Sequence, residues 1–234
     1  MNNYRTPSQM PSQVGVRPTT ALSAGFLTQA FTWMFVGLLL TAGVSYLVQS
    51  NDRLYSAARD LFLPAIVLEL GVVFAIGLFI NRISALLALA LFFVYAALNG
   101  LTIALIVSAY TTASVGVAFL SAAAAFGGAA VYGAVTKRSL VSMGGYLFMA
   151  LIGLLVAMLV NLFLQNNMIS LVISAVGVVI FTALTAYDVQ RIQTGDYAAG
   201  MGSMEKGAVF GALRLYLDFI NLFLLFLRLT GSRR

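Results

Sequence analysis

Seven apolar stretches, each about as long as a bilayer is thick, constrain this 234-residue chain more than any other feature. They cover residues 26–49, 61–81, 83–108, 113–135, 143–164, 168–190 and 208–229. Because a transmembrane helix needs about 20 mainly apolar residues, each stretch predicts one membrane span. The breaks between the stretches are too short for a soluble domain. The sequence therefore predicts an all-α membrane protein with seven transmembrane helices.

The N-terminal segment differs from everything that follows it. Residues 1–22 hold three of the four prolines and no long apolar run, which is typical of a flexible tail. Residues 23–234 then form a single transmembrane domain, whose partner is the lipid bilayer.

The composition excludes several classes of protein. Hydrophobic residues make up 61% of the chain and charged residues only 9%, against roughly 25% charged residues in soluble domains. The net charge of +6 is spread over both ends and several loops, so nucleic-acid binding is not expected. The chain contains no Cys and no His, so we expect no cofactor and no metal held by those ligands. Without histidine, a response near neutral pH must come from carboxyl groups.

The basic residues between the predicted spans indicate topology. Seven fall on the side that holds the N-terminus and five on the other side. Because cytoplasmic loops carry an excess of Lys and Arg, this distribution favours a cytoplasmic N-terminus and an external C-terminus. The first group is Arg5, Arg17, Arg82, Lys137, Arg138, Arg191 and Lys206, and the second is Arg53, Arg59, Arg228, Arg233 and Arg234.

Ionisable side chains inside the spans are the candidate functional residues, because a charge at the centre of a span costs roughly 2.5–3.5 kcal/mol. They are Glu69, Asp188, Arg214 and Asp218, with Arg82 at the inner end of the second span. Each aspartate also has a structural interpretation. Asp188 can pair with Arg191, three residues later. Asp218 can pair with Arg214, four residues before it on the same helix face.

Glu69 lies near the middle of the second span. A lone glutamate at that depth must be protonated, paired or facing water. Facing a pore, it would attract a cation. In the structural interpretation, it is protonated and hydrogen-bonded to a neighbouring helix.

The two aspartates would titrate together if they met. A neighbouring like charge and burial both oppose the ionisation of two carboxyls at once, so a proton shared by Asp188 and Asp218 would supply a pH response near neutrality. Asp218 lies about 18 Å along a helix from Lys206, whereas Asp188 lies only about 4.5 Å from Arg191. Contact therefore requires the last helix to begin inside a wet vestibule, near Arg214.

Three segments resemble the Bax inhibitor-1 family of membrane proteins and, within it, the bacterial YccA-like branch. They are “LYLDFINLFLLFLRL” at 215–229, “GVVIFTALTAYDVQRIQ” at 177–193 and “YGAVTKRSL” at 132–140. The resemblance implies seven helices with the last one central and surrounded by the other six. It also implies a pH-sensitive calcium leak across a bacterial inner membrane.

The same resemblance assigns roles to single residues. It makes Asp188 and Asp218 the hydrogen-bonded pH-sensing pair, and it places Glu69 at a position that lines the pore. Arg82 corresponds to a basic residue that latches the pair in the closed state. Close relatives carry a basic run there, whereas this chain has a single arginine after Asn81.

Two other functions compete with a cation leak. The first is an intramembrane aspartyl protease, in which one aspartate activates water and the other donates a proton. Asp218 follows “LYL” and not a glycine-rich GxGD motif, so the sequence does not favour an enzyme. The second is a regulator that transports nothing and binds other membrane proteins, such as a membrane-bound protease.

Overall fold

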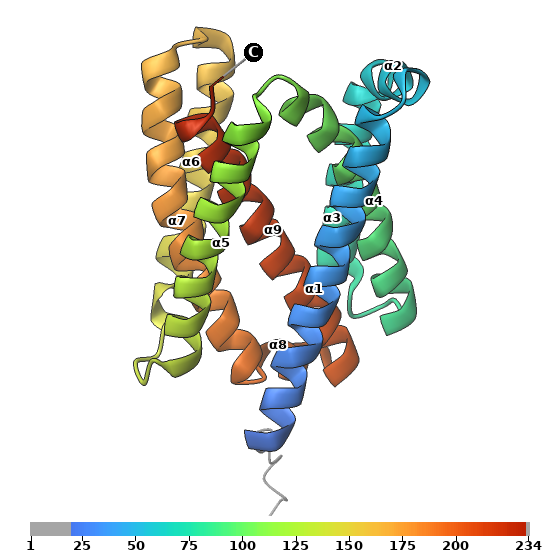
Figure 1. The fold of residues 1–234 in the computed structure, drawn as a ribbon. Coiled ribbons are helices and arrows are strands. Elements are labelled where there is room, and N and C mark those ends of the chain that lie inside the picture. Colours follow the sequence, from blue (N-terminus) through green and yellow to red (C-terminus); the bar gives the residue numbers. More distant parts are fainter. Residues whose placement is uncertain (1–19, 233–234) are drawn as a thin grey trace, which may run out of the picture.

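Seven long helices dominate the computed structural model, which describes residues 20–232, with side chains from residue 25 onward (Figure 1). All seven are long and apolar enough to cross a membrane, and no β-strand occurs within those residues. The predicted all-α class and the seven spans are confirmed. The spans are α1 (Thr20–Gln49), α3 (Phe62–Phe79), α4 (Ala85–Ser108), α5 (Thr112–Val135), α6 (Gly144–Leu164), α7 (Asn167–Gln193) and α9 (Met204–Thr230).

Polar residues in the breaks begin several of these helices. Ser84 accepts a hydrogen bond from the amide of Leu87 at the start of α4, and Asn166 caps α7 in the same way through Met168 and Ile169. Such side chains satisfy amide groups that have no partner inside the helix. The helix α9 begins at Met204, four positions before the predicted start of the last span at residue 208. The predicted tail, residues 1–22, lies outside the described residues except for its last three, which belong to α1.

Two short helices were not predicted. The helix α2 (Asp52–Asp60) begins after the N-cap Asn51, and only its Ala58 is buried. The helix α8 (Asp196–Met201) lies between Gly195 and Gly202, whose positive φ angles of 76° and 62° favour glycine. Both helices are too short to show the apolar run of a span. A 3₁₀ turn, η1 (Val141–Met143), also precedes α6.

The last span lies between two groups of three helices. In Figure 1, α9 crosses obliquely between α5, α6 and α7 on one side and α1, α3 and α4 on the other. It is the most buried of the seven spans. Its contacts involve α1, α4, α5, α7 and α8, so the enclosure of α9 by all six other spans stays a prediction.

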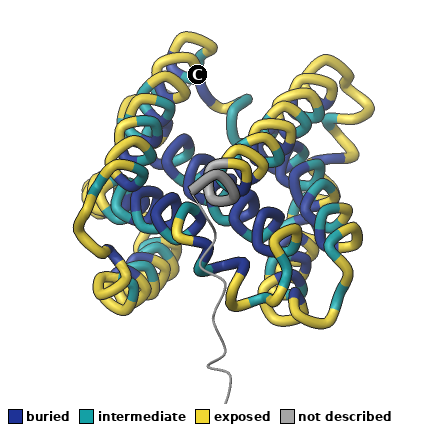
Figure 2. The backbone as a smooth tube through the Cα atoms, turned by 90° about the horizontal axis from the view of Figure 1, so that it is seen from below, coloured by how far each residue is buried: buried dark blue, intermediate teal, exposed yellow. Residues whose placement is uncertain are grey.

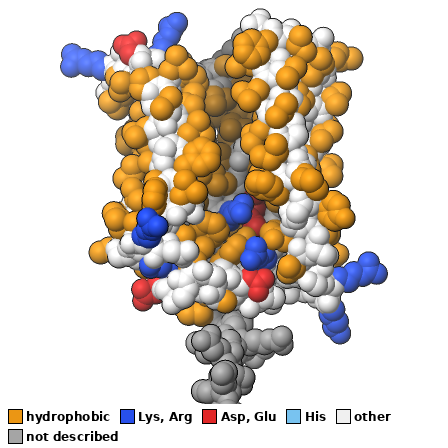
Figure 3. Space-filling model, turned by 180° about the vertical axis from the view of Figure 1, so that it is seen from behind, with side chains coloured by type: hydrophobic (Ala, Val, Ile, Leu, Met, Phe, Trp, Pro, Cys, Tyr) orange, Lys and Arg blue, Asp and Glu red, His pale blue; other side chains and the backbone are white. Residues whose placement is uncertain are grey.

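The outer surface is that of a protein surrounded by lipid. Buried residues face the interior and exposed residues face outward along most helices (Figure 2). Figure 3 shows a broad apolar band, with Lys and Arg side chains near both ends and charged atoms also visible in a hollow between helices. The start of α1 and the C-terminus lie at opposite ends of the bundle, as an odd number of spans requires.

The contact between α5 and α7 depends on glycine. A Cβ atom at Gly133 would overlap the main-chain carbonyl of Ala186 on α7, whereas a Cβ at Gly127 would meet nothing within 4 Å. We expect Gly133→Ala to lower stability by about 1–3 kcal/mol, because the two helix backbones must separate. Gly127→Ala is the matched control and should be neutral or slightly stabilising. Thermal unfolding in detergent measures both, and equal midpoints would contradict this account of the contact.

Candidate functional site

Asp188 lies in the last two turns of α7 and is almost completely buried, with 1% of its surface exposed. Its Oδ1 accepts a hydrogen bond of 2.6 Å from the hydroxyl of Tyr197. Tyr197 comes from α8, which turns back beneath the bundle, and its ring packs edge-on against Phe210 of α9. The short helix α8 therefore delivers the donor that holds this carboxyl.

The hydroxyl of Tyr197 remains a donor over the physiological range. Burial raises the pKa of Tyr197, and the adjacent Asp188 carboxylate raises this pKa further. The positive charges of Arg214 and Arg191 oppose these effects but are smaller. Sequence reasoning missed Tyr197, because nothing in a nine-residue separation across a turn indicates that its hydroxyl returns to Asp188.

Arg191 forms its direct ion pair with Asp196 and not with Asp188, the partner considered from the sequence. Its Nε lies 3.5 Å from Oδ2 of Asp196, and its Nη1 donates to the hydroxyl of Tyr187 at 3.1 Å. The guanidinium also lies over the rings of Tyr187 and Tyr197, at 5.6 and 4.8 Å from their centroids. Arg191 acts on Asp188 only at longer range. It thus orients the aromatic side chains around the aspartate.

Asp218 enters the same region from α9 and is 4% exposed. Its Oδ2 is buried and accepts no hydrogen bond within the described residues. Thr185 of α7 faces this carboxyl, while its own hydroxyl donates to the carbonyl of Phe181 at 2.8 Å. Asp188 and Arg214 are the charged groups that act on Asp218. The structure therefore brings the two predicted aspartates together, although no hydrogen bond joins their carboxyls in the described part of the chain.

The tilt of α9 explains how these aspartates approach each other. The distances along the helix axes, calculated from the sequence, predict that Asp218 lies far deeper in the membrane than Asp188. Because α9 runs obliquely across the bundle, distance along its axis overstates depth (Figure 1). The wet vestibule expected near Arg214 stays a prediction.

Arg214 is the cation that the two aspartates share. It lies one turn before Asp218, and its guanidinium is 5.5 Å from the ring centroid of Phe210. It interacts electrostatically with Asp188 of α7 and with Asp218 of its own helix. Neither interaction is a direct ion pair among the described residues. One guanidinium therefore interacts with two buried carboxyls. We call these two residues, Asp188 and Asp218, the acid pair.

Glu69 belongs to a separate polar cluster between α3 and α4. Its Oε1 accepts a hydrogen bond from the hydroxyl of Thr102 at 2.9 Å, and its Oε2 accepts one from Nδ2 of Asn99 at 3.3 Å. The same Nδ2 donates to the hydroxyl of Tyr95 at 3.2 Å. Glu69 is therefore hydrogen-bonded to a neighbouring helix, which is the contact that its structural interpretation requires. A role in lining a pore stays a prediction.

A second set of polar contacts links this cluster to α9. The hydroxyls of Tyr216 and Thr41 lie 2.6 Å apart, and Thr41 donates to the carbonyl of Ala96 at 2.8 Å. The rings of Tyr216 and Tyr95 pack edge-on, with centroids 5.7 Å apart. Isolated polar residues inside apolar spans are the signal that would have identified these positions from the sequence.

Arg82 is not part of the acid pair. It is exposed in the turn between α3 and α4, and it is not among the charged groups that act on Asp188 or Asp218 in the described structure. The same turn is tied to α9, because Nζ of Lys206 donates to the carbonyl of Asn81 at 3.3 Å. The latch role of Arg82 stays a prediction.

Comparison with known proteins identifies the family. The profile of the family described as “Inhibitor of apoptosis-promoting Bax1” matches residues 23–234, nearly the whole chain. The chain belongs to the Bax inhibitor-1 family. This family member is 39% identical to the inner membrane protein YbhL of Escherichia coli over 225 residues, which cover 94% of the chain and 96% of YbhL. It is 44% identical to an uncharacterized protein of Deinococcus radiodurans over 209 residues, which cover 89% and 90% of the two chains. With its seven apolar spans, it is a multi-pass membrane protein.

The contact between Tyr197 and Asp188 can be tested in this Bax inhibitor-1 family member. Tyr197→Phe removes the donor and keeps the ring, so the buried carboxyl loses its hydrogen bond. We expect a loss of about 1.5–3 kcal/mol in the free energy of unfolding, as for hydrogen bonds to charged groups. Tyr46→Phe is the matched control, because Tyr46 is 71% exposed. Equal stability of the two variants would show that the contact contributes little.

Proposed function

We propose that this protein is a pH-sensitive cation leak, with calcium as the permeant ion, gated by proton exchange at the acid pair. The observation that carries the proposal is the burial of Asp188 and Asp218, from two different helices, around the single guanidinium of Arg214. Membership of the Bax inhibitor-1 family supports it, as the sequence resemblance first indicated.

The charges of the acid pair and Arg214 explain why binding or losing a proton would matter. Arg191 is already paired with Asp196, which leaves two carboxyls and one cation in the buried region. An uncompensated buried charge is costly, and a single proton on either carboxyl makes the cluster neutral. The unpartnered Oδ2 of Asp218 is a free acceptor position for this proton. Proton exchange therefore changes the charge at the contact between α7 and α9.

A change at this contact would reach the rest of the bundle through α9. We take α9 as the axis of the fold, with the other six spans around it. In this interpretation, losing the proton places two like charges between α7 and α9 and alters how the helices pack. The N-terminus lies in the cytoplasm of a bacterial cell, and the spans cross its inner membrane.

Glu69 would lie on the ion path. A dedicated calcium site takes six to eight oxygen ligands, and Glu69 has only Thr102 and Asn99 as direct polar partners. So few ligands suit a passing ion better than a resident one. The buried Oδ1 of Asn99 has no hydrogen-bond partner among the described residues and is a further oxygen that such an ion would meet.

Flux through reconstituted protein tests the gating. We expect calcium flux into proteoliposomes to change between about pH 6 and pH 8 in the wild type. Asp218→Asn should abolish this pH dependence, because Asp188 and Arg214 then form a balanced pair that needs no proton. Asp60→Asn, on the exposed α2, is the control and should keep the wild-type profile. A pH dependence that survives Asp218→Asn would overturn the gating mechanism.

Two arginine variants separate the candidate partners of the acid pair. Arg214→Gln removes the shared cation, so the carboxyls should hold their proton to higher pH. We expect the midpoint of the flux transition to rise by roughly one to three pH units, and Arg214→Lys should restore much of it. Arg82→Gln should leave the midpoint unchanged. A shift in Arg82→Gln alone would instead favour the predicted latch.

The same preparations distinguish the alternative function. If the wild-type protein passes no cation at any pH and retains a membrane-bound protease during purification, the leak is wrong and a regulator that transports nothing is favoured. Cleavage of a membrane substrate that depends on Asp188 would favour the aspartyl protease.

A further inference from the structure

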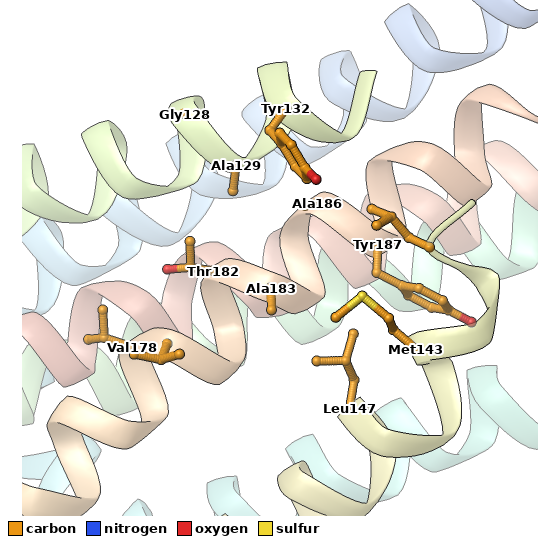
Figure 4. A pocket seen from close by; sticks show the side chains of 12 residues that line it. Gly128, Ala129, Tyr132, Met143, Leu147, Val178, Thr182, Ala183, Ala186 and Tyr187 are labelled. Atoms are coloured by element: carbon orange, nitrogen blue, oxygen red, sulfur yellow. The ribbon is translucent and has the colours of Figure 1, made fainter. Parts of the chain in front are cut away.

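An apolar cavity of about 580 Å³ lies between α5, α6 and α7, and neither aspartate of the acid pair lines it. Its volume is within the roughly 300–1,000 Å³ typical of ligand pockets. Figure 4 shows Tyr132 and Ala129 of α5 on one side, Ala183 and Thr182 of α7 along the floor, and Met143 and Leu147 on the other side.

The close contacts on either side of the cavity explain its shape. Gly133 brings α5 against the backbone of α7, and Gly144 lets the start of α6 approach the ring of Tyr187. Both α5 and α6 therefore pack on α7. The wedge between them stays open towards the lipid, as the exposure of Tyr132 and Met143 shows.

A basic loop lies beside the cavity, which it reaches through Leu140, and hydrogen bonds hold this loop in place. Lys137 and Arg138 are exposed on the loop that joins α5 to η1, next to the cavity residue Leu140. Gln190 of α7 makes two hydrogen bonds to this loop. Its Nε2 donates to the carbonyl of Arg138 at 2.8 Å, and its Oε1 accepts from the amide of Leu140 at 2.7 Å. The two cations are thus presented from a fixed backbone at the membrane surface.

The same loop borders a second, more polar cavity of about 690 Å³. Lys137 and Arg138 line it together with Ser139 and Thr194. The carboxylate of Asp196 also lines it, but this group is paired with Arg191. The unpaired charge of the second cavity is therefore positive.

We propose that these two cavities form a binding site for an anionic phospholipid. One acyl chain occupies the apolar cavity between α5 and α6, and the headgroup phosphate lies against Lys137 and Arg138. Basic pockets between spans on the cytoplasmic side favour such headgroups, and the loop lies on the side that carries most of the basic residues. The combination of an apolar cavity between spans with two exposed cations beside it is what suits a lipid with an anionic headgroup.

Lipid binding to the purified full-length chain tests the site. Native mass spectrometry would measure retention of phosphatidylglycerol and phosphatidylcholine with the same acyl chains. We expect phosphatidylglycerol to be retained selectively, and the double variant Lys137→Gln/Arg138→Gln to weaken its binding roughly 10- to 30-fold, with no effect on phosphatidylcholine. Arg53→Gln/Arg59→Gln is the matched control, because it removes two exposed cations from α2, at the other end of the bundle.

A second variant tests the acyl-chain cavity. Ala183→Trp fills the cavity floor and should weaken retention of both lipids at the site. Its thermal midpoint, and that of the surface double variant, would show that the fold is kept. Equal retention of the two lipids by the wild type would mean surrounding lipid only and would overturn the proposal. Equal binding of inorganic phosphate without a lipid chain would also overturn it.

Discussion

The burial of two carboxyls around one guanidinium is the constraint on which the rest of this bundle depends. Lipid offers no partners for these groups, so the face of α9 that carries Arg214 and Asp218 must lie against protein. Burial of α9 between the two groups of three helices satisfies this requirement. The chain then turns through α8, and the hydroxyl of Tyr197 donates a hydrogen bond to one carboxyl oxygen of Asp188. The order of elements at this end of the fold follows from the cost of buried charge.

The sequence predicts the spans well and their polar partners poorly. Length and apolar composition suffice for the seven helices, and breaks such as the one around Asn166 fix their ends through capping. The intramembrane aspartates were also identified, because a charge in a span is conspicuous. Their partners depend on tertiary approach. Sequence spacing suggested an ion pair between Asp188 and Arg191. In the fold, Arg191 instead pairs with Asp196, and Asp188 accepts a hydrogen bond from Tyr197.

Two polar regions of this bundle are connected through one helix. The cluster around Glu69 lies between α3 and α4, and the acid pair lies between α7 and α9. Tyr216 contacts the first region through Tyr95 and Thr41, and Asp218 follows it by two residues on the same helix. A rigid displacement of α9 caused by proton exchange would move both groups together. Under the proposed gating, this shared helix would let a proton on one side of the bundle affect a carboxyl on the other.

The lipid-facing cavity and the acid pair also share a physical connection. Tyr187 lines the cavity, and its hydroxyl accepts a hydrogen bond from Arg191. The guanidinium of Arg191 lies over the ring of Tyr197, whose hydroxyl donates to Asp188. Each step is a direct contact between adjacent side chains, so a molecule that moved Tyr187 would disturb the donor that holds the aspartate. Only Arg191 and Tyr197 thus lie between the cavity residue Tyr187 and Asp188 along this series of contacts.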